Sequence, residues 1–333
     1  MGKPSTRAVA ASAAVAAGGA LAAGKVVRGV VAERAERERA RRFRLAPDEA
    51  PRAGIGRVAR GQLDIAIELI QGRDGDSAEA VHEARKALKR VRAVLRLCRG
   101  WLGEERYRQE NTILRDAGRS LSGLRDAQVL VETLDGLREP LGPELPEDAW
   151  SGFRERLTAD AAALAETEGR AGPYGNVVLA LAGVRERAEL WPLPHDGGPE
   201  HLANGLEQVY RKARRARRRA NRERTTENLH ELRKRTKDLW HSGQLLDPLS
   251  RKRVGKLRRR AHRVSDLLGE DHDLAVLLDR AEQVPEAFGP GELELLGALA
   301  ERRRRALARE ALSRAAKLYR RKPRKLARRL AAA

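Results

Sequence analysis

The chain has 333 residues, 41% of them hydrophobic, so it can bury the core of one large domain or of two ordinary ones. Lys and Arg number 68 against 47 Asp and Glu, a formal net charge of +21 at pH 7. Self-repulsion of this size is relieved by a polyanion, so nucleic acid, inorganic polyphosphate and an anionic membrane are the candidate partners. The single cysteine, Cys98, has no second thiol to pair with, which excludes an intrachain disulfide framework.

The N-terminal segment "AVAASAAVAAGGALAAG" (8–24) is mostly Ala and Gly and follows Lys3 and Arg7. It is shorter than the roughly 20 strongly apolar residues that a membrane-spanning helix needs. We therefore expect residues 1–50 to form a flexible basic tail in the cytoplasm, with a membrane anchor as the weaker alternative. The mixed-charge stretch "ERAERERARRFR" (33–44) is typical of a solvated helix.

From residue 54 onward the sequence predicts an all-α fold. Apolar residues recur at spacings of three and four, and alternating β-branched runs are absent. Pro-rich breaks at 138–150 and 191–200 separate helical segments, and a basic tail is expected over 323–333. Helices are expected over 54–72, 77–100, 104–122, 125–138, 147–169, 174–190, 199–223, 226–247, 250–269, 271–284 and 290–320.

The stretch "VHEARKALKRVRAVLRLCR" (81–99) carries two stripes at helical spacing. The apolar stripe comprises Val81, Ala84, Leu88, Val91, Leu95 and Cys98. The basic stripe, one residue further on, comprises His82, Arg85, Lys89, Arg92, Arg96 and Arg99. One residue is about 100° of rotation on a helix, so the basic row borders the buried row and presents a cation about every 5 Å. Cys98 is expected to be a small buried hydrophobe in a reducing compartment.

Two pairs of segments repeat along the chain. "VHEARKALKRVR" (81–92) matches "LHELRKRTKDLW" (229–240), with His, Glu, Arg and Lys at the same offsets, and "LSGLRDAQVL" (121–130) matches "LGEDHDLAVL" (268–277). Asp126 follows His82 by 44 residues, and Asp273 follows His230 by 43. Two landmarks at one spacing indicate a duplication, with a first half over about 54–170 and a second over about 174–322.

The His-x-x-Arg-Lys start followed by a Leu-Gly-x-x-Arg-Asp-x-x-Val type signature, each occurring twice over about 54–322, resembles the CHAD family of conserved-histidine α-helical domains. The resemblance implies two pseudo-symmetric four-helix halves that form one helical domain around a basic groove or pore. It also implies a module that binds inorganic polyphosphate, with no catalytic role and no cofactor. We expect His82 and His230 to face a shared basic cavity.

Carried over position by position, the motifs assign a set of cations to each half. Second-half departures are His272, where the motif has Arg, and a shorter basic stripe, so a weaker anion site is expected there. Asp126 and Asp273 are expected to orient Arg or His, or to act as first-turn helix acids. With neighbouring cations, the candidate polyphosphate-binding residues are His82, Arg85, Lys86, Lys89, Arg92, Arg96, Arg115, Arg119, Arg125, His230, Arg233, Lys234, Lys237, Lys256, Arg259 and Arg263.

Two other functions stay open. The histidines His241, His262 and His272 invite comparison with helical metal-dependent phosphohydrolases, but Arg125, at the position that matches His272, is no metal ligand. Nonspecific nucleic-acid binding fits the charge, although 3 Phe, 4 Tyr and 4 Trp offer few stacking platforms. The runs 211–219 and 320–329 are as compatible with a solvated face as with a site. Polyphosphate-metabolism enzymes and polyphosphate granules are the further expected associations.

Overall fold

The computed structural model describes residues 38, 42–46, 49–72, 77–139, 145–146, 148–170, 174–194, 199–249 and 251–331. The chain divides into two compact units, Met1–Phe43 and Arg44–Ala333. Most of the tail predicted over 1–50, including the Ala-rich segment 8–24, lies outside the described residues. The following description concerns the second unit.

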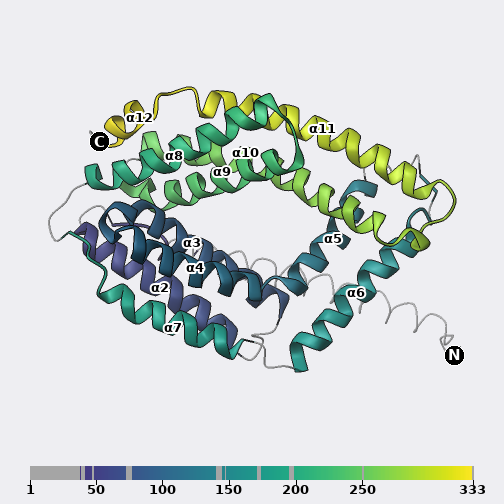
Figure 1. Ribbon diagram of the computed structural model, residues 1–333, viewed down its shortest axis with the longest axis horizontal. Helices are drawn as coiled ribbons and strands as arrows, with labels where there is room; N and C mark the ends of the chain where they lie inside the picture. Colours follow the sequence, from purple (N-terminus) through teal and green to yellow (C-terminus); the bar gives the residue numbers. More distant parts are fainter. Residues whose placement is uncertain are drawn as a thin grey trace, which may run out of the picture. The chain divides into compact units, whose positions relative to one another are not determined.

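Eleven α-helices and two short 3₁₀ helices make up the described part of the second unit, which contains no strand (Figure 1). The predicted all-α class is therefore confirmed. The helices are α2 (Pro51–Gln71), α3 (Ala78–Leu102), α4 (Glu104–Ser120), α5 (Gly123–Arg138), α6 (Ser151–Arg170), α7 (Gly175–Glu189), α8 (Pro199–Arg222), α9 (Thr226–Leu246), η2 (Asp247–Leu249), α10 (Arg251–Glu282), η3 (Pro285–Ala287), α11 (Glu292–Leu318) and α12 (Pro323–Ala331).

Helix α10 corrects one sequence prediction. Two helices were expected, over 250–269 and 271–284, but α10 is continuous for 32 residues and passes through Gly269. A glycine inside a helix costs up to about 1 kcal/mol relative to alanine, which tertiary packing can override. Leu268 and Leu274, on either side of this glycine, are 1% and 5% exposed, so burial of the apolar residues holds the helix together.

The two repeated segments differ in how their helices are joined. In the first half, α4 ends before Leu121 and α5 begins at Gly123, so the second motif starts a new helix. In the second half the matching residues lie in the middle of α10. The separation in sequence between the motif His and Asp is also one residue longer in the first half, 44 residues against 43. The pseudo-symmetry of the halves stays a prediction.

Helix α3 lies at the centre of the packing. It contacts α2, α4, α5, α8 and α9, and α9 in turn contacts α8 and α10 (Figure 1). Its predicted apolar stripe is confirmed, because Val81, Ala84, Leu88, Val91, Leu95 and Cys98 are all at most 1% exposed. The basic row beside that stripe is thereby held next to the neighbouring helices.

Residues 323–331 of the basic tail expected over 323–333 form helix α12. Helix α12 packs against α8 and buries Leu326 and Ala327. The turn before it is held by α8, because the Tyr210 hydroxyl donates to the Leu318 carbonyl at 3.0 Å and Arg214 Nε donates to the Tyr319 carbonyl at 3.1 Å. Part of the basic run 211–219 therefore anchors the chain terminus.

The contact between α8 and α3 generates a prediction about stability. A methyl group on Gly205 would overlap the Leu97 carbonyl oxygen and lie 2.8 Å from the Leu97 Cα, so the two backbones would have to separate. We expect Gly205→Ala to destabilise the protein by about 1–3 kcal/mol in denaturant unfolding.

The matched control is Gly136→Ala on α5, where a Cβ meets nothing within 4 Å. This variant should be stabilised by up to about 1 kcal/mol, because alanine is the better helix former. Equal stability of the Gly205→Ala variant and the parent would contradict the close helix contact.

Candidate functional site

The basic row of α3 faces a second basic row on α9. Burial, with the charges of Lys237, Arg85 and Arg233, lowers the pKa of Lys89 to about 7. Burial, with the charge of Arg233 and to a smaller extent that of Lys86, lowers the pKa of Lys237 to about 8. Each helix thus carries cations that act on the other, and we call Arg85, Lys86, Lys89, Arg233 and Lys237 the central cluster.

Lys89 is exposed to solvent although surrounding protein lowers its pKa. The two observations agree if the ammonium group lies in a depression that water enters but that protein atoms largely surround. Lysine does not usually remain neutral near pH 7, since its ordinary pKa is about 10.5. The central cluster is therefore a place where positive charge is crowded and incompletely hydrated.

Asp126 contacts one arginine of the cluster and also lies in the first turn of α5, so it fits both roles expected of it. Arg85 Nη1 donates to Asp126 Oδ1 at 2.9 Å and approaches the Ser122 carbonyl oxygen at 3.4 Å. In the second half, Arg233 lies against Gly269, and its charge acts on Asp273. Burial nevertheless raises the pKa of Asp273, and the charge of Asp126 adds to that rise. The two acids thus approach each other beside the cluster.

A second ion pair recurs at the same offset in both halves. Lys86 Nζ lies 2.7 Å from Glu83 Oε1, and Lys234 Nζ lies 2.8 Å from Glu231 Oε2. Glu83 is only 3% exposed and Glu231 27%. These glutamates hold the lysines one turn away along the helix and moderate their charge.

The motif histidines are neutral at pH 7. Burial and the charges of Lys86 and Arg125 lower the pKa of His82 to about 4. The rings of His230 and His272 lie 4.2 Å apart, and burial lowers the pKa of both, that of His272 to about 4. The Nδ1 atoms of this pair have no hydrogen-bond partner in the described part of the chain. A shared cavity between His82 and His230 stays a prediction.

Toward the end of α3 the basic row meets an acid. Arg96 Nη1 lies 3.3 Å from Asp238 Oδ1, and Arg235 also reaches Asp238 at 3.5 Å. Arg92 Nε donates to Asn111 Oδ1 at 3.1 Å, while burial and the charge of Arg96 lower the Arg92 pKa to about 10. The charge is therefore partly balanced here, unlike that of Lys89 and Lys237 in the central cluster.

The candidates on α4 and α5 form ion pairs at the surface. Arg115 Nε lies 2.8 Å from Asp116 Oδ1, and Arg119 lies 3.8 Å from the same atom. Arg115 is close enough to Arg92 to lower its pKa. Arg125 makes two bonds of 2.8 and 3.0 Å to the Glu132 carboxylate. Arg115 and Arg125 thus border the main row.

The candidates on the first part of α10 lie elsewhere. Lys256, Arg259 and Arg263 line an open pocket between α10 and α11 whose lining includes no residue of α3 or α9. These three predicted polyphosphate-binding residues are therefore not brought together with the cations of α3 and α9. They face α11 because that helix packs along α10, a contact that the repeated motifs do not encode.

One residue near the histidine pair was missed. Arg304 of α11 donates to Thr226 Oγ1 at 2.9 Å and lies 3.4 Å from Asp271, and its charge helps to lower the pKa of His272. The sequence signal was the run "RRRR" (302–305), which lies outside both motifs and has no stripe pattern. Only the packing of α11 identifies which of these arginines turns inward.

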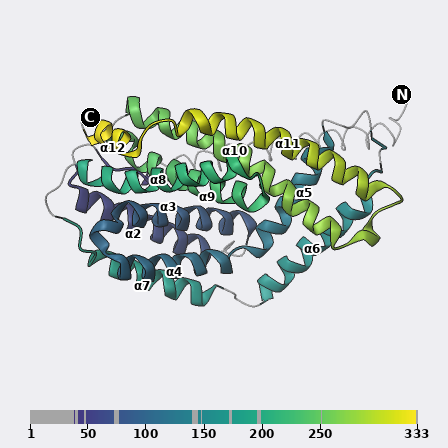
Figure 2. The ribbon, with the colours of Figure 1, turned by 45° about the horizontal axis from the view of Figure 1, so that its top comes forward.

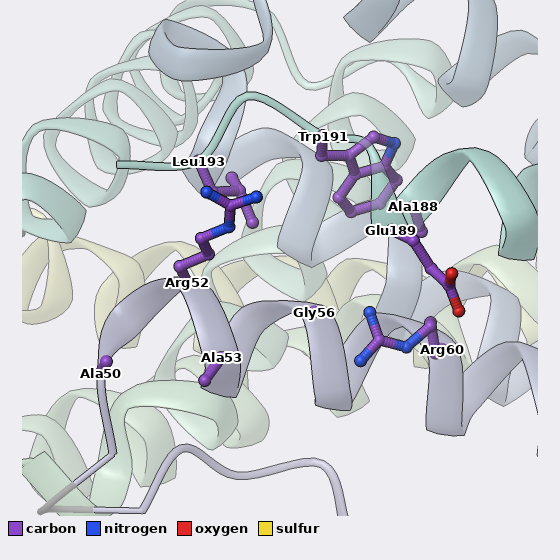
Figure 3. A pocket seen from close by; sticks show the side chains of 9 residues that line it. All are labelled: Ala50, Arg52, Ala53, Gly56, Arg60, Ala188, Glu189, Trp191 and Leu193. Carbon is purple, nitrogen blue, oxygen red and sulfur yellow. The ribbon is translucent and has the colours of Figure 1, made fainter. Parts of the chain in front are cut away.

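A separate pocket of about 340 Å³ lies beside α2 (Figure 3). Arg52 and Arg60 extend from α2, and Glu189 and Trp191 come from the end of α7 and the segment after it. Trp191 is 1% exposed. This pocket carries charges of both signs and is chemically unlike the central cluster.

The remaining histidines that suggested a hydrolase, His241 and His262, both contact the ring of Trp240. His241 is buried, with its Nδ1 3.1 Å from Gln244 Oε1. His262 stacks on Trp240 at 4.6 Å and lies 2.9 Å from Asp266. No group of three or more His, Cys, Asp or Glu side chains that could hold a metal ion occurs among the described residues.

None of the helices in the described ranges combines the length and the apolar content needed to cross a bilayer. The segment 8–24, considered above as an anchor, is not among those ranges.

Comparison with known proteins identifies the family. The model of the CHAD domain matches residues 57–282. The crystal structure of the CHAD domain from the plant Ricinus communis is similar, with a TM-score of 0.55 and 21% identity over 83% of this chain and 91% of that one. No protein of curated function matches the sequence. Because the family model covers more than half of the chain, this protein belongs to the CHAD domain family.

Proposed function

We propose that the central cluster binds inorganic polyphosphate and does not cleave it. The observation that carries the proposal is the burial of Lys89 and Lys237 among neighbouring cations, which lowers their pKa values to about 7 and 8. A linear polyanion supplies the missing negative charge to both helices at once. Arginine forks and lysine ammonium groups are suited to phosphate oxygens.

The aromatic residues favour polyphosphate over single-stranded nucleic acid. All Phe, Tyr and Trp side chains of the chain lie in the described part, and none of them is exposed. Trp240, three residues after Lys237, already contacts the rings of His241 and His262. Strand binding without sequence preference depends on exposed aromatic platforms, whereas polyphosphate has no bases to stack.

The composition of the cluster favours binding over catalysis. Its members are cations that attract a phosphate chain, and the nearby Asp126 is held by Arg85 at 2.9 Å. We expect purified protein to release no orthophosphate from polyphosphate, with or without Mg²⁺, Mn²⁺ or Zn²⁺. Metal-dependent release that tracks the protein through purification would replace the proposal with a hydrolase.

We further propose a cytoplasmic role at polyphosphate granules, or in regulating enzymes of polyphosphate metabolism. The net charge of +21 supports recruitment to a dense polyanion through long-range attraction. Fluorescently tagged protein should co-localise with granules, and a variant with a neutralised central cluster should do so less.

Neutralising the two facing lysines should weaken binding without harming the fold. In the Lys89→Met and Lys237→Met double variant, affinity for long-chain polyphosphate should fall by about tenfold or more, because hydrogen bonds to charged groups contribute roughly 1.5–3 kcal/mol each. The slope of log affinity against log salt concentration should become shallower by about 0.7 per lost phosphate contact, if the coefficient for single-stranded nucleic acid is applied to polyphosphate.

The matched control is Lys322→Met with Lys325→Met, two exposed lysines at the start of α12. It removes the same charge and should change polyphosphate affinity much less. The central double variant should unfold at no lower temperature than the parent, since it relieves repulsion. Parent-like binding by a folded central variant would sink the proposal.

Binding should also depend on pH in a defined direction. A polyanion stabilises the charged form of Lys89 and Lys237, so complex formation takes up protons where the free lysines are neutral. Affinity should be level below pH of about 7 and decline above it, as pH passes the free pKa values of about 7 and 8. Calorimetry in buffers of different ionisation enthalpy should show proton uptake near pH 8, and the central double variant should lack it.

Competition at physiological salt separates the two binding functions. With labelled polyphosphate bound, duplex DNA at the same phosphate concentration should displace little of it, because a wide duplex reaches partly buried lysines less readily than a slim phosphate chain does. Equal displacement by DNA would favour a nonspecific nucleic-acid-binding protein.

A further inference from the structure

A second basic surface lies between α10 and α11, two helices that run alongside each other in both ribbon views (Figures 1 and 2). It forms an open pocket of about 740 Å³. This volume is in the range of roughly 300–1,000 Å³ that small-molecule sites occupy. Its lining residues, which we call the α10–α11 groove, are Lys256, Arg259, Arg260, Arg263, Glu310, Ser313, Arg314 and Lys317.

The charge of this groove is strongly unbalanced. Its lining contains six cations and one acid, Glu310, whose carboxylate lies 2.7 Å from Arg314. The five other cations make no ion pair with any described residue, whereas many arginines elsewhere pair with a carboxylate. Five cations around one concave surface, without internal partners, create a potential that attracts an anion.

The spacing of the cations suits several linked phosphates. Lys256, Arg259 and Arg263 recur at three and four residues on one side of α10, over a rise of about 10 Å. Arg314 and Lys317 approach from α11 on the opposite wall. An anion in the groove would meet hydrogen-bond donors from two sides along two helical turns. These donors outnumber those that one phosphate group requires.

The shape favours a slim anion over a nucleic-acid duplex. Helices α10 and α11 pack directly on each other, and directly packed helices have axes only about 8–10 Å apart. A duplex could touch the rim of such a groove but could not enter it. Short chains of phosphate groups can enter and meet both walls.

We propose that the α10–α11 groove is a second anion site, which binds short oligophosphates. The inference goes beyond the proposed function, since the groove has its own lining and does not need the central cluster to bind. The ligand chemistry is that of linked phosphates, supplied either by a free short oligophosphate or by a segment of a longer polyphosphate chain.

The experiment uses the full chain and a thiol placed in the groove. Ser313 is exposed there, while the native Cys98 is fully buried, so the thiol introduced by Ser313→Cys is the one that a neutral alkylating reagent modifies. With tripolyphosphate at about ten times its Kd, modification should slow about tenfold, in proportion to occupancy. Ser151→Cys, an exposed position on α6, should show no protection.

Two added variants locate the protection. Arg259→Gln with Arg263→Gln should abolish it, whereas Arg218→Gln with Arg222→Gln, an equal loss of exposed charge on α8, should preserve it. Lys89→Met with Lys237→Met should also preserve it. This last result separates the groove from the central cluster. The proposed function of the central cluster is contradicted by a different result, namely parent-like binding of long-chain polyphosphate by that double variant.

Absence of protection by tripolyphosphate would overturn the inference. Loss of protection in the central double variant but not in the groove variant would assign the anion to the central cluster. Equal protection by duplex DNA at the same phosphate concentration would make the groove a nucleic-acid surface. Repeating the assay with long-chain polyphosphate distinguishes a free short oligophosphate from a segment of a longer chain. If one long chain occupies both sites, protection of the groove thiol by that chain should weaken in the central double variant.

Discussion

The burial and crowding of cations where α3 meets α9 is the constraint around which the structure is arranged. Lys89 and Lys237 have ordinary pKa values of 10.5, yet they fall to about 7 and 8. Charging them opposes folding as pH falls below about 10. The packing of α3 onto five other helices, with its apolar stripe buried, must hold these cations together against their mutual repulsion.

The surrounding side chains moderate the repulsion without cancelling it. Glu83 and Glu231 pair with the lysines next along each helix, and Asp126 pairs with Arg85. The histidines stay uncharged because burial and neighbouring cations lower their pKa. Lys89 and Lys237 form no ion pair with any described residue. A polyanion bound at the central cluster, as proposed, would therefore stabilise the protein, and this coupling would link the fold to the proposed function.

The sequence predicted what local periodicity and the two motifs encode. The buried stripe of α3 and the all-α class follow from spacing within helices, whereas the partner of Asp126, Arg85, is identified by the packing of α5 against α3. It did not predict that α10 continues through Gly269, because burial of Leu268 and Leu274 outweighs a local helix break. Nor could it assign Lys256, Arg259 and Arg263 to a separate groove or find Arg304, because both depend on how α11 packs.

The most direct test of the central claim is to measure the pKa values of Lys89 and Lys237 by NMR of the side-chain ammonium groups, with and without polyphosphate. The account predicts values near 7 and 8 in the free protein, rising toward or above 10 when long-chain polyphosphate is added at physiological salt. Values near 10.5 in the free protein, or depressed values that polyphosphate leaves unchanged, would contradict it.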